Sequence, residues 1–197
     1  MMYNSIWRQL LNWLLTKVTS TLSKNGISYV EAGSIDQPIC DRRGDLICAD
    51  WGYAYLASTN GSGKSVSLGD YYGMKESFVK NGTLATTKAK WTTRKEEDNP
   101  AMAYVHNLGS VSNSGKEGFM MLGYDDIYSI EYMYEKRMGY WKHDGKVTIF
   151  DAFEKLRDNY QAIMERCRAF DELIYDDAEK AGGKKYAEIC SASYRQV

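Results

Sequence analysis

Residues 46–57 read LICADWGYAYLA, and this stretch decides the fold class. Apolar and aromatic residues dominate it, as is typical of strands, and Gly52 allows a bend or a bulge. An earlier run, GISYVEAG at residues 26–33, places Ile27, Tyr29 and Glu31 at alternate positions. Alternation with a period of two is typical of a strand with one buried face. Both stretches therefore predict β-structure.

Turn-forming sequences separate several further strand candidates. DRRGD, STNGSGKS, KNGT and SVSNSGKEG supply Gly and Asn residues that tolerate a positive φ, and Asn81 followed by Gly82 is a hairpin signal. We expect strands near residues 26–32, 45–58, 76–80, 83–92, 101–107 and 117–124. Because no helical pattern of useful length interrupts them, the sequence favours an antiparallel, supersandwich-like β-sandwich over a parallel sheet.

The period of the sequence changes after Val147. Apolar residues then follow at alternating spacings of three and four, which is the pattern of one helix face. They are Phe153, Leu156, Tyr160, Ile163, Cys167, Phe170 and Ile174. Thr148 with Asp151 approximates a capping box, while Gly182 and Gly183 interrupt the pattern before a second helical run. We therefore expect a long linker helix from about residue 148 to residue 177.

The expected architecture is mainly β with C-terminal α. Residues 1–22 form an unassigned N-terminal segment, residues 23–147 a β-sandwich-type domain, and residues 148–197 the linker helix and the start of a helical domain. A helical stripe of this length needs a larger partner surface than one sheet offers. We expect further helices, absent from this sequence, to follow in a longer parent protein.

Charge and hydropathy exclude several classes of partner. With 25 basic and 26 acidic residues, the chain lacks the strong positive field that nucleic acids or anionic membranes attract. The first 18 residues read as neither a signal peptide nor a membrane span, because Asn12 breaks the apolar run and no small-residue cleavage site follows. As a helix, this segment is amphipathic through Ile6, Leu10, Trp13 and Leu14.

The cysteines and histidines do not predict a metal site. Cys40, Cys48, Cys167 and Cys190 lack the spacing of zinc ligands, and only His106 and His143 are available to complete a set. We therefore expect no metal and no cofactor. Cys40 and Cys48 lie on either side of Gly44, so they form either a cross-strand disulfide or two half-buried thiols.

Two short motifs suggest chemistry that their context does not support. GSGKS at residues 61–65 resembles part of a phosphate-binding loop, but the leading glycine is replaced by Ser58 and the following VSLGDYYG does not predict a helix. A polar loop fits better. In HDG at residues 143–145 the acid and the histidine are adjacent and do not converge, so we interpret the motif as a turn.

The candidate site residues lie in MLGYDDIYSIEYMYEKRMGYW, residues 121–141. Asp125 and Asp126 are consecutive, so in an extended chain their carboxylates point to opposite faces and do not form an acid/base pair. Either one can instead cap the turn by accepting backbone N–H bonds. Tyr128, Glu131 and the tyrosines after it are expected in a short helical turn that forms an aromatic, acid-lined surface.

Four separated segments together resemble a known family. They are QPICDRRGDLICADWGYAYLAS, NPAMAYVHNLGSV, FMMLGYDDIYSIEYMYEKRMGYW and RCRAFDELIYDDAEKAGGKKYAEICSASYRQV. Their order and spacing over about residues 23–197 resemble the amino-terminal domain of the glutaminase A-like proteins of Bacteroides-type bacteria and fungi. The resemblance implies a much longer, exported parent, periplasmic or secreted, whose helical toroid is like those of six-hairpin glycosidases. It also implies hydrolysis of L-glutamine to glutamate and ammonia.

Two hypotheses of function follow. In the first, the chain is a non-catalytic accessory domain, inactive alone, whose YDDIYSIEY edge docks on the helical domain of the parent, where a small-molecule substrate binds. In the second, Asp125, Asp126 or Glu131 contributes to the active site of an amidohydrolase or a glycosidase-like enzyme. A third, weaker hypothesis is a carbohydrate-binding module that uses Trp51, Trp91 or Trp141 for stacking.

Overall fold

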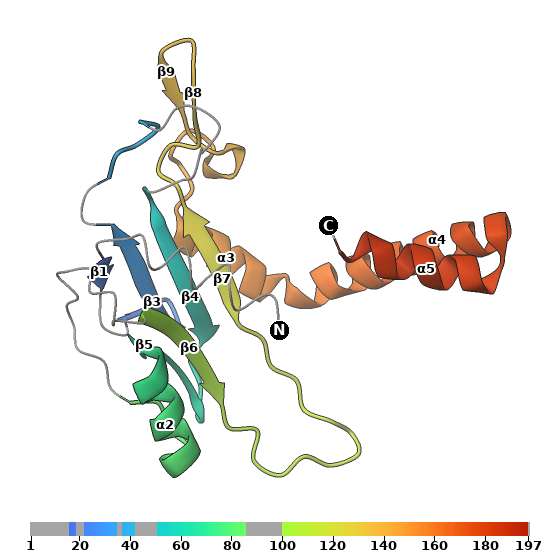
Figure 1. Ribbon diagram of the computed structural model, residues 1–197, viewed down its shortest axis with the longest axis horizontal. Helices are drawn as coiled ribbons and strands as arrows, with labels where there is room; N and C mark the ends of the chain where they lie inside the picture. The colour runs from blue at the N-terminus through green and yellow to red at the C-terminus, as the bar shows by residue number, and fades with distance from the viewer. Residues whose placement is uncertain (1–15, 19–21, 35–36, 42–50, 86–99, 197) are drawn as a thin grey trace. The chain divides into compact units, whose positions relative to one another are not determined.

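A central antiparallel sheet organises the amino-terminal part of the protein (Figure 1). The computed structural model describes residues 16–18, 22–34, 37–41, 51–85 and 100–196. Within them the sheet has the order β1-β3-β4-β7, and β2 also pairs with β3. The strands are β1 (Thr16–Val18), β2 (Leu22–Lys24), β3 (Ile27–Ser34), β4 (Tyr53–Thr59) and β7 (Met121–Asp125). The strands predicted near residues 26–32, 45–58 and 117–124 are thus present over their described parts as β3, β4 and β7, with shifted bounds.

The alternation seen in the sequence separates two buried faces of this sheet. Tyr29 of β3 lies opposite Ala57 of β4, and Val30 lies opposite Leu56. Tyr29 and Ala57 belong to one apolar cluster, whereas Val30 and Leu56 belong to another. Because successive residues of a strand point to opposite faces, both faces of β3 and β4 are covered.

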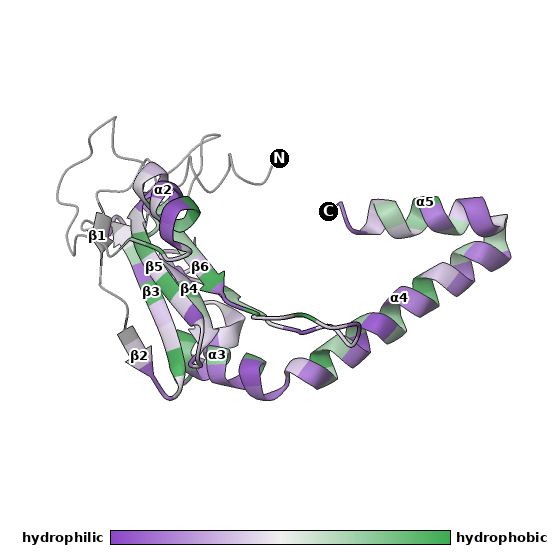
Figure 2. Cartoon of the chain, turned by 90° about the horizontal axis from the view of Figure 1, so that it is seen from below, coloured by the Kyte–Doolittle hydropathy of each residue, from purple (hydrophilic) through white to green (hydrophobic). Residues whose placement is uncertain are grey.

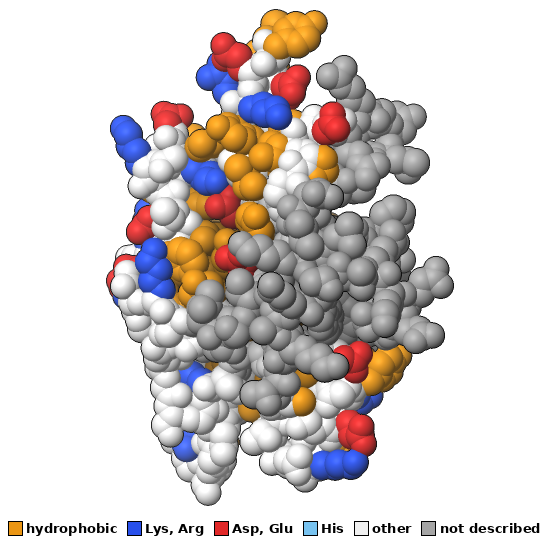
Figure 3. Space-filling view, turned by 90° about the vertical axis from the view of Figure 1, so that its left-hand side faces the viewer, with side chains coloured by type: hydrophobic (Ala, Val, Ile, Leu, Met, Phe, Trp, Pro, Cys, Tyr) orange, Lys and Arg blue, Asp and Glu red, His pale blue; other side chains and the backbone are white. Residues whose placement is uncertain are grey.

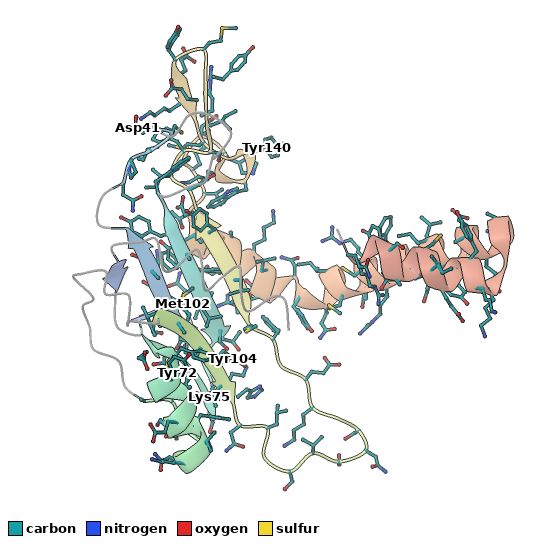
Figure 4. The ribbon with its side chains drawn as sticks, viewed as in Figure 1. Asp41, Tyr72, Lys75, Met102, Tyr104 and Tyr140 are labelled. Carbon is teal, nitrogen blue, oxygen red and sulfur yellow. The ribbon has the colours of Figure 1, made fainter. Side chains whose placement is uncertain are left out.

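A two-stranded antiparallel sheet covers the face of the central sheet that carries Val30 and Leu56. It consists of β5 (Lys64–Asp70) and β6 (Pro100–His106). Val66 and Leu68 of β5 pack against Val30, Ala32 and Leu56, with Met102 and Tyr104 at the margin of the cluster. Figure 4 shows Met102 and Tyr104 on this layer. The described residues therefore form antiparallel sheets in layers, without a closed barrel, and the prediction of a mainly β fold with C-terminal helices is confirmed.

Helix α3 (Ile149–Asp158) begins on the opposite face of the central sheet. Its buried residues Ile149 and Phe153 complete the apolar cluster that contains Tyr29 and Ala57. A Cβ atom on Gly123 of β7 would lie 2.7 Å from Cζ of Phe153, so glycine is what allows this close approach. The predicted capping box is confirmed, because the Thr148 amide donates to Asp151 and the Asp151 amide donates to the Thr148 hydroxyl.

Two further helices follow α3 along the chain. α4 (Tyr160–Gly182) and α5 (Lys184–Tyr194) lie side by side, and the predicted interruption at Gly182 and Gly183 is confirmed (Figure 2). The single long helix expected from residue 148 to residue 177 is instead divided at Asn159, whose side-chain amide donates to the Lys155 carbonyl. By internal contacts the chain divides into two compact units, Met1–Glu154 and Lys155–Val197.

Helix α2 (Tyr71–Asn81) corrects the prediction of a strand at residues 76–80. Its start is fixed by Asp70, whose carboxylate accepts the Gly73 amide at 2.7 Å. Gly82 ends the helix in a left-handed conformation, with φ of 67°. The Asn81 and Gly82 pair is thus a helix terminator and not a hairpin turn, because Gly serves both structures through the same positive φ.

Four other expectations about local structure have mixed outcomes. β5 begins within the sequence interpreted as a polar loop and follows GSG directly, so a strand and not a helix comes next. The segment VSLGDYYG was nevertheless wrongly expected not to start a helix, because α2 begins at Tyr71 inside it. Residues 83–85 of the strand predicted at 83–92 are not in a strand, while residues 86–92 lie outside the described part. The strand predicted at residues 101–107 is confirmed as β6. The proposed amphipathic segment around residues 6–14 lies outside the described residues.

A small hairpin projects from the end of β7. It is formed by β8 (Ile130–Tyr132) and β9 (Glu135–Arg137), so the predicted helical turn through Tyr128, Glu131 and Tyr132 is wrong. Met133 and Tyr134 form the turn with φ values of 50° and 66°. The 3-10 helix η1 (Tyr140–Lys142) follows, and the predicted turn at residues 143–145 is confirmed by the positive φ of all three residues.

Candidate functional site

Asp125 lies at the end of β7, where the chain leaves the central sheet. One oxygen of its carboxylate, Oδ1, accepts the Ile127 amide at 2.9 Å, and the Lys142 ammonium lies 2.6 Å from the same oxygen. Lys142 also donates to the Ile127 carbonyl at 3.3 Å. Asp125 therefore caps the turn, as its residue type predicted, and ties this turn to η1.

The ion pair between Asp125 and Lys142 is largely shielded from water. Their side chains are 19% and 10% exposed, and the Lys142 ammonium lies 5.5 Å from the centroid of the Trp141 ring. A charge held in such a place is stable only while it is paired and hydrogen-bonded. Oδ1 of the Asp125 carboxylate thus helps to hold the local structure together.

Asp126 has a different environment. Its carboxylate oxygen Oδ1 is buried and has no hydrogen-bond partner among the described residues. The backbone of this residue packs against Gly52, where a Cβ atom would lie 2.9 Å from the Asp126 Cα and 2.5 Å from the Asp125 carbonyl oxygen. The φ of Gly52 is +92°, which also requires glycine. The bend predicted at Gly52 is therefore the feature that lets the Asp125 turn approach β4.

The backbone of Tyr128 is held from two sides. The Trp51 indole donates to the Tyr128 carbonyl at 3.0 Å, and the Cys40 thiol lies 3.8 Å from the same oxygen. The Tyr124 hydroxyl in turn donates to the Trp51 carbonyl. Trp51 is buried and works as an anchor, which argues against its use as a stacking platform for sugars. Trp141 packs at the margin of the apolar cluster that α3 completes, and Trp91 lies outside the described residues.

The Cys40 thiol lies close to three charged side chains. Burial raises its pKa above the ordinary value, the carboxylates of Glu131 and Asp126 raise the pKa further, and the Lys136 ammonium opposes them. A raised pKa disfavours the thiolate, which is the nucleophilic form of cysteine. The proposed pairing of Cys40 with Cys48 falls on a residue outside the described part.

The three candidate carboxylates therefore do not form one constellation. Asp125 pairs with Lys142, while the charges of Asp126 and Glu131 both raise the pKa of the Cys40 thiol. Glu131 is exposed on β8, opposite Lys136 of β9. Asp126 and Glu131 thus share an influence on one side chain, whereas Asp125 has a different charged partner.

Sequence reasoning missed two residues that matter here. Lys142 carried no signal, because a single lysine after a tryptophan is ordinary surface composition. Glu31 was placed on the face of Ile27 and Tyr29 by alternation, but its role became visible only with its cross-strand partner Tyr55. Burial, and then the charge of Glu31 and a hydrogen bond to it, raise the pKa of Tyr55.

Aromatic side chains are conspicuous on the hairpin. Tyr132 is 61% exposed, Met133 74% and Tyr134 96%, and Tyr140 of η1 is 92% exposed. Figure 3 shows hydrophobic side chains at the end of this projection, with charged side chains below them. Tyr140 points away from η1 (Figure 4). This end of the β unit thus presents an apolar surface beside the carboxylates of Asp126 and Glu131.

Taken together, the geometry defines a layered antiparallel β domain followed by helices, with a carboxylate-containing edge organised mainly by structural contacts. The chain belongs to the family described as domain of unknown function DUF5127, whose model matches residues 12–177. The match covers all the described β strands together with α2, α3 and much of α4.

A curated relative carries a functional name. The chain is 29% identical over 154 residues to Glutaminase A of Aspergillus oryzae (strain ATCC 42149 / RIB 40). That alignment covers 76% of this chain and 22% of the relative, so the chain spans about a fifth of the length of the protein that it matches. The resemblance to glutaminase A-like proteins is thus confirmed. No solved structure is matched by the chain.

The described residues hold neither a membrane-spanning helix nor a metal-binding cluster. None of the helices there is both long and apolar enough to cross a lipid bilayer. Within the same residues, no three His, Cys, Asp or Glu side chains are grouped so that they could hold a metal ion.

Proposed function

We propose that this chain is the non-catalytic amino-terminal accessory domain of a glutaminase A-like hydrolase. The observation that carries the proposal is the Asp125 carboxylate, which is occupied by the Ile127 amide and the Lys142 ammonium. A general acid or base needs a carboxylate that can turn toward its substrate, whereas the Asp125 side chain is held in place by two structural contacts on Oδ1. Similarity to Glutaminase A over 22% of that protein supports a longer, glutaminase-like parent. This parent hydrolyses L-glutamine and is exported.

The partner in this proposal is the helical domain of the parent, a toroid like those of six-hairpin glycosidases. Residues 124–132 and the hairpin tip form the docking edge, because they hold the most exposed aromatic side chains of the β unit. Apolar surface of this kind is typical of a face that another protein surface covers. Docking there would place Asp126 and Glu131 at the margin of the helical domain.

Ammonia release from L-glutamine tests the absence of catalysis. The pure 197-residue chain should release no more ammonia than buffer does, and Asp126→Asn should leave this background unchanged. Release well above background that is abolished by Asp126→Asn would overturn the accessory role.

That opposite result would favour the second candidate function, in which Asp126 and Glu131 supply active-site carboxylates. One observation supports it: Oδ1 of Asp126 is buried without a partner among the described residues. A buried polar atom without a structural partner is unusual in a folded protein and is available to a substrate group. Any such activity would then be lost in Asp126→Asn and in Glu131→Gln.

A chimera tests the docking edge. This chain would replace the matched segment of the Aspergillus oryzae Glutaminase A, and Tyr132→Ser with Tyr134→Ser should lower the activity and the melting temperature of the chimera. Val79→Ser on α2 is the matched control, because Val79 is 76% exposed and lies away from the edge in sequence and in fold. An active chimera that responds equally to both changes would contradict docking through the hairpin.

A further inference from the structure

Helix α4 carries an exposed seam that α5 does not cover. Phe170 and Leu173 are 47% and 54% exposed, although they are the large apolar residues at the centre of the helix. Arg166 and Asp177, one helical turn before and after them, are also exposed. The spacing 166, 170, 173, 177 is four, three, four, which keeps the four side chains on one face of the helix. We define these four residues as the α4 seam.

Helix α5 packs on a neighbouring face of α4. Ala178 of α4 and Ala187 of α5 are the buried residues of these two helices. Arg195 pairs with Asp171 at 2.7 Å, and the Tyr194 ring lies 5.5 Å from the Phe170 ring. Phe170 therefore stands at the boundary between the surface that α5 covers and the seam that remains open. Figure 2 shows apolar and polar residues alternating along α4.

The α4 seam is complementary to itself in the antiparallel direction. The spacing of its residues is four, three, four from either end. From Arg166 to Asp177 the side chains are a cation, two apolar groups and an anion. A second α4 that runs in the opposite direction presents the anion where the first presents the cation. With a two-fold axis between Asp171 and Glu172, Phe170 meets Leu173 of the second copy, and Arg166 meets Asp177.

We propose that the α4 seam is the interface at which two copies of this chain associate as an antiparallel pair. Two-fold pairing brings the same patch of each copy together, and self-complementarity is what such an interface requires. The two apolar contacts lie at the centre of the seam, and the two Arg166 to Asp177 contacts lie at its ends, where they set direction and register. This inference does not depend on the proposed function.

Sedimentation of the 197-residue chain tests the pairing. The wild-type chain should reach twice the monomer mass of 22.5 kDa as its concentration rises. Arg166→Glu places two anions together, and Asp177→Arg places two cations together, so each change should raise the dissociation constant by at least about tenfold. Arg168→Glu is the matched control, since Arg168 is exposed on the same helix outside the seam.

Two rescue arms separate pairing from a loss of folding. The double variant Arg166→Glu with Asp177→Arg restores opposite charges and should pair again. An equal mixture of the two single variants should form a mixed pair for the same reason, although each alone stays monomeric. A wild-type chain that is monomeric at every concentration would overturn the proposal and leave the seam to other helices of a longer polypeptide. Pairing that ignores the single reversals, or that neither arm restores, would also overturn it.

Discussion

At the scale of single residues, the contact between Lys142 and Asp125 should contribute strongly to stability. Lys142→Met keeps most of the side-chain volume but leaves the Asp125 carboxylate buried and unpaired. We expect it to lower the free energy of unfolding by about 3–5 kcal/mol, the usual cost of breaking a buried pair from one side. Urea unfolding measures this change.

Two controls make that measurement specific. The double variant Lys142→Met with Asp125→Asn should lose less than the sum of the two single changes, because no charge is then left unpaired. Lys80→Met breaks an exposed pair with Glu76, both 66% exposed, and should cost at most about 0.5 kcal/mol. Equal losses at Lys142 and Lys80 would show that burial adds nothing to the Asp125 pair.

Tyr55 is the residue that should control how the stability of the chain responds to alkaline pH. Burial, with help from the Glu31 carboxylate, raises the pKa of Tyr55 above its ordinary value of 10.0. The folded state therefore holds the phenol proton more tightly than the unfolded state does. This contribution to stability is fully present below about pH 10 and is lost as the pH rises further. Tyr29 shares the same direction, with burial as its main cause.

Tyr55→Phe should therefore flatten the loss of stability between about pH 9 and about pH 11, since phenylalanine has no proton to lose. Urea unfolding across this interval gives the slope. Tyr134→Phe changes a tyrosine that is 96% exposed and should reproduce the slope of the unmodified 197-residue chain. If Tyr55→Phe kept the slope of the unmodified chain, other groups would control the alkaline response.

At the scale of secondary structure elements, the attachment of α3 to the sheet is the critical contact. Phe153 is 1% exposed and fills the space that Gly123 leaves open. Phe153→Ala should lower the free energy of unfolding by about 3–5 kcal/mol. Leu156→Ala, on the same helix but 43% exposed, should cost only about 1 kcal/mol. Thermal or urea unfolding of both variants measures the two losses of stability. Similar losses would show that burial of Phe153 on the sheet is not the critical contact.

The same two residues show how far the sequence predicts the elements. Phe153 and Leu156 belong to one apolar stripe, and the stripe correctly predicted a helix. It did not reveal that the sheet buries only the first turns, because burial depends on which surface faces the helix and not on periodicity alone. Alternation likewise predicted β3, and a composition rich in apolar and aromatic residues predicted β4.

Errors at the element scale arose where one residue type serves two structures. Asp70 and Gly82 bound α2 as cap and terminator, although Asp and Gly are equally common in hairpin turns. The hairpin of β8 and β9 was missed because its turn uses Met133 and Tyr134, neither of which favours a left-handed conformation. At the candidate site, the capping role of Asp125 was predictable from its residue type, but the Lys142 partner, distant in sequence, was not.

At the scale of the whole molecule, the two compact units differ in how much they bury. β3 and β4 contribute most of the buried apolar residues of the first unit, whereas Ala187 is the buried residue of α5. Helices that bury few side chains open at a low cost in free energy. In hydrogen exchange, amides of Ile27–Ser34 and Tyr53–Thr59 should therefore be protected far longer than those of Lys184–Tyr194. Equal protection would indicate that α5 is stabilised by contacts beyond Ala187.

The tip of the β8–β9 hairpin has a consequence for redesign of this protein. Met133 and Tyr134 occupy left-handed conformations that cost ordinary residues about 1–2 kcal/mol each, and Asn followed by Gly would relieve that strain. Met133→Asn with Tyr134→Gly should therefore raise the melting temperature of the isolated chain. The same exchange removes the two most protruding side chains of the hairpin, so selection for thermal stability alone would erase them. A chain stabilised in this way would therefore lose the side chains through which the tip is proposed to dock.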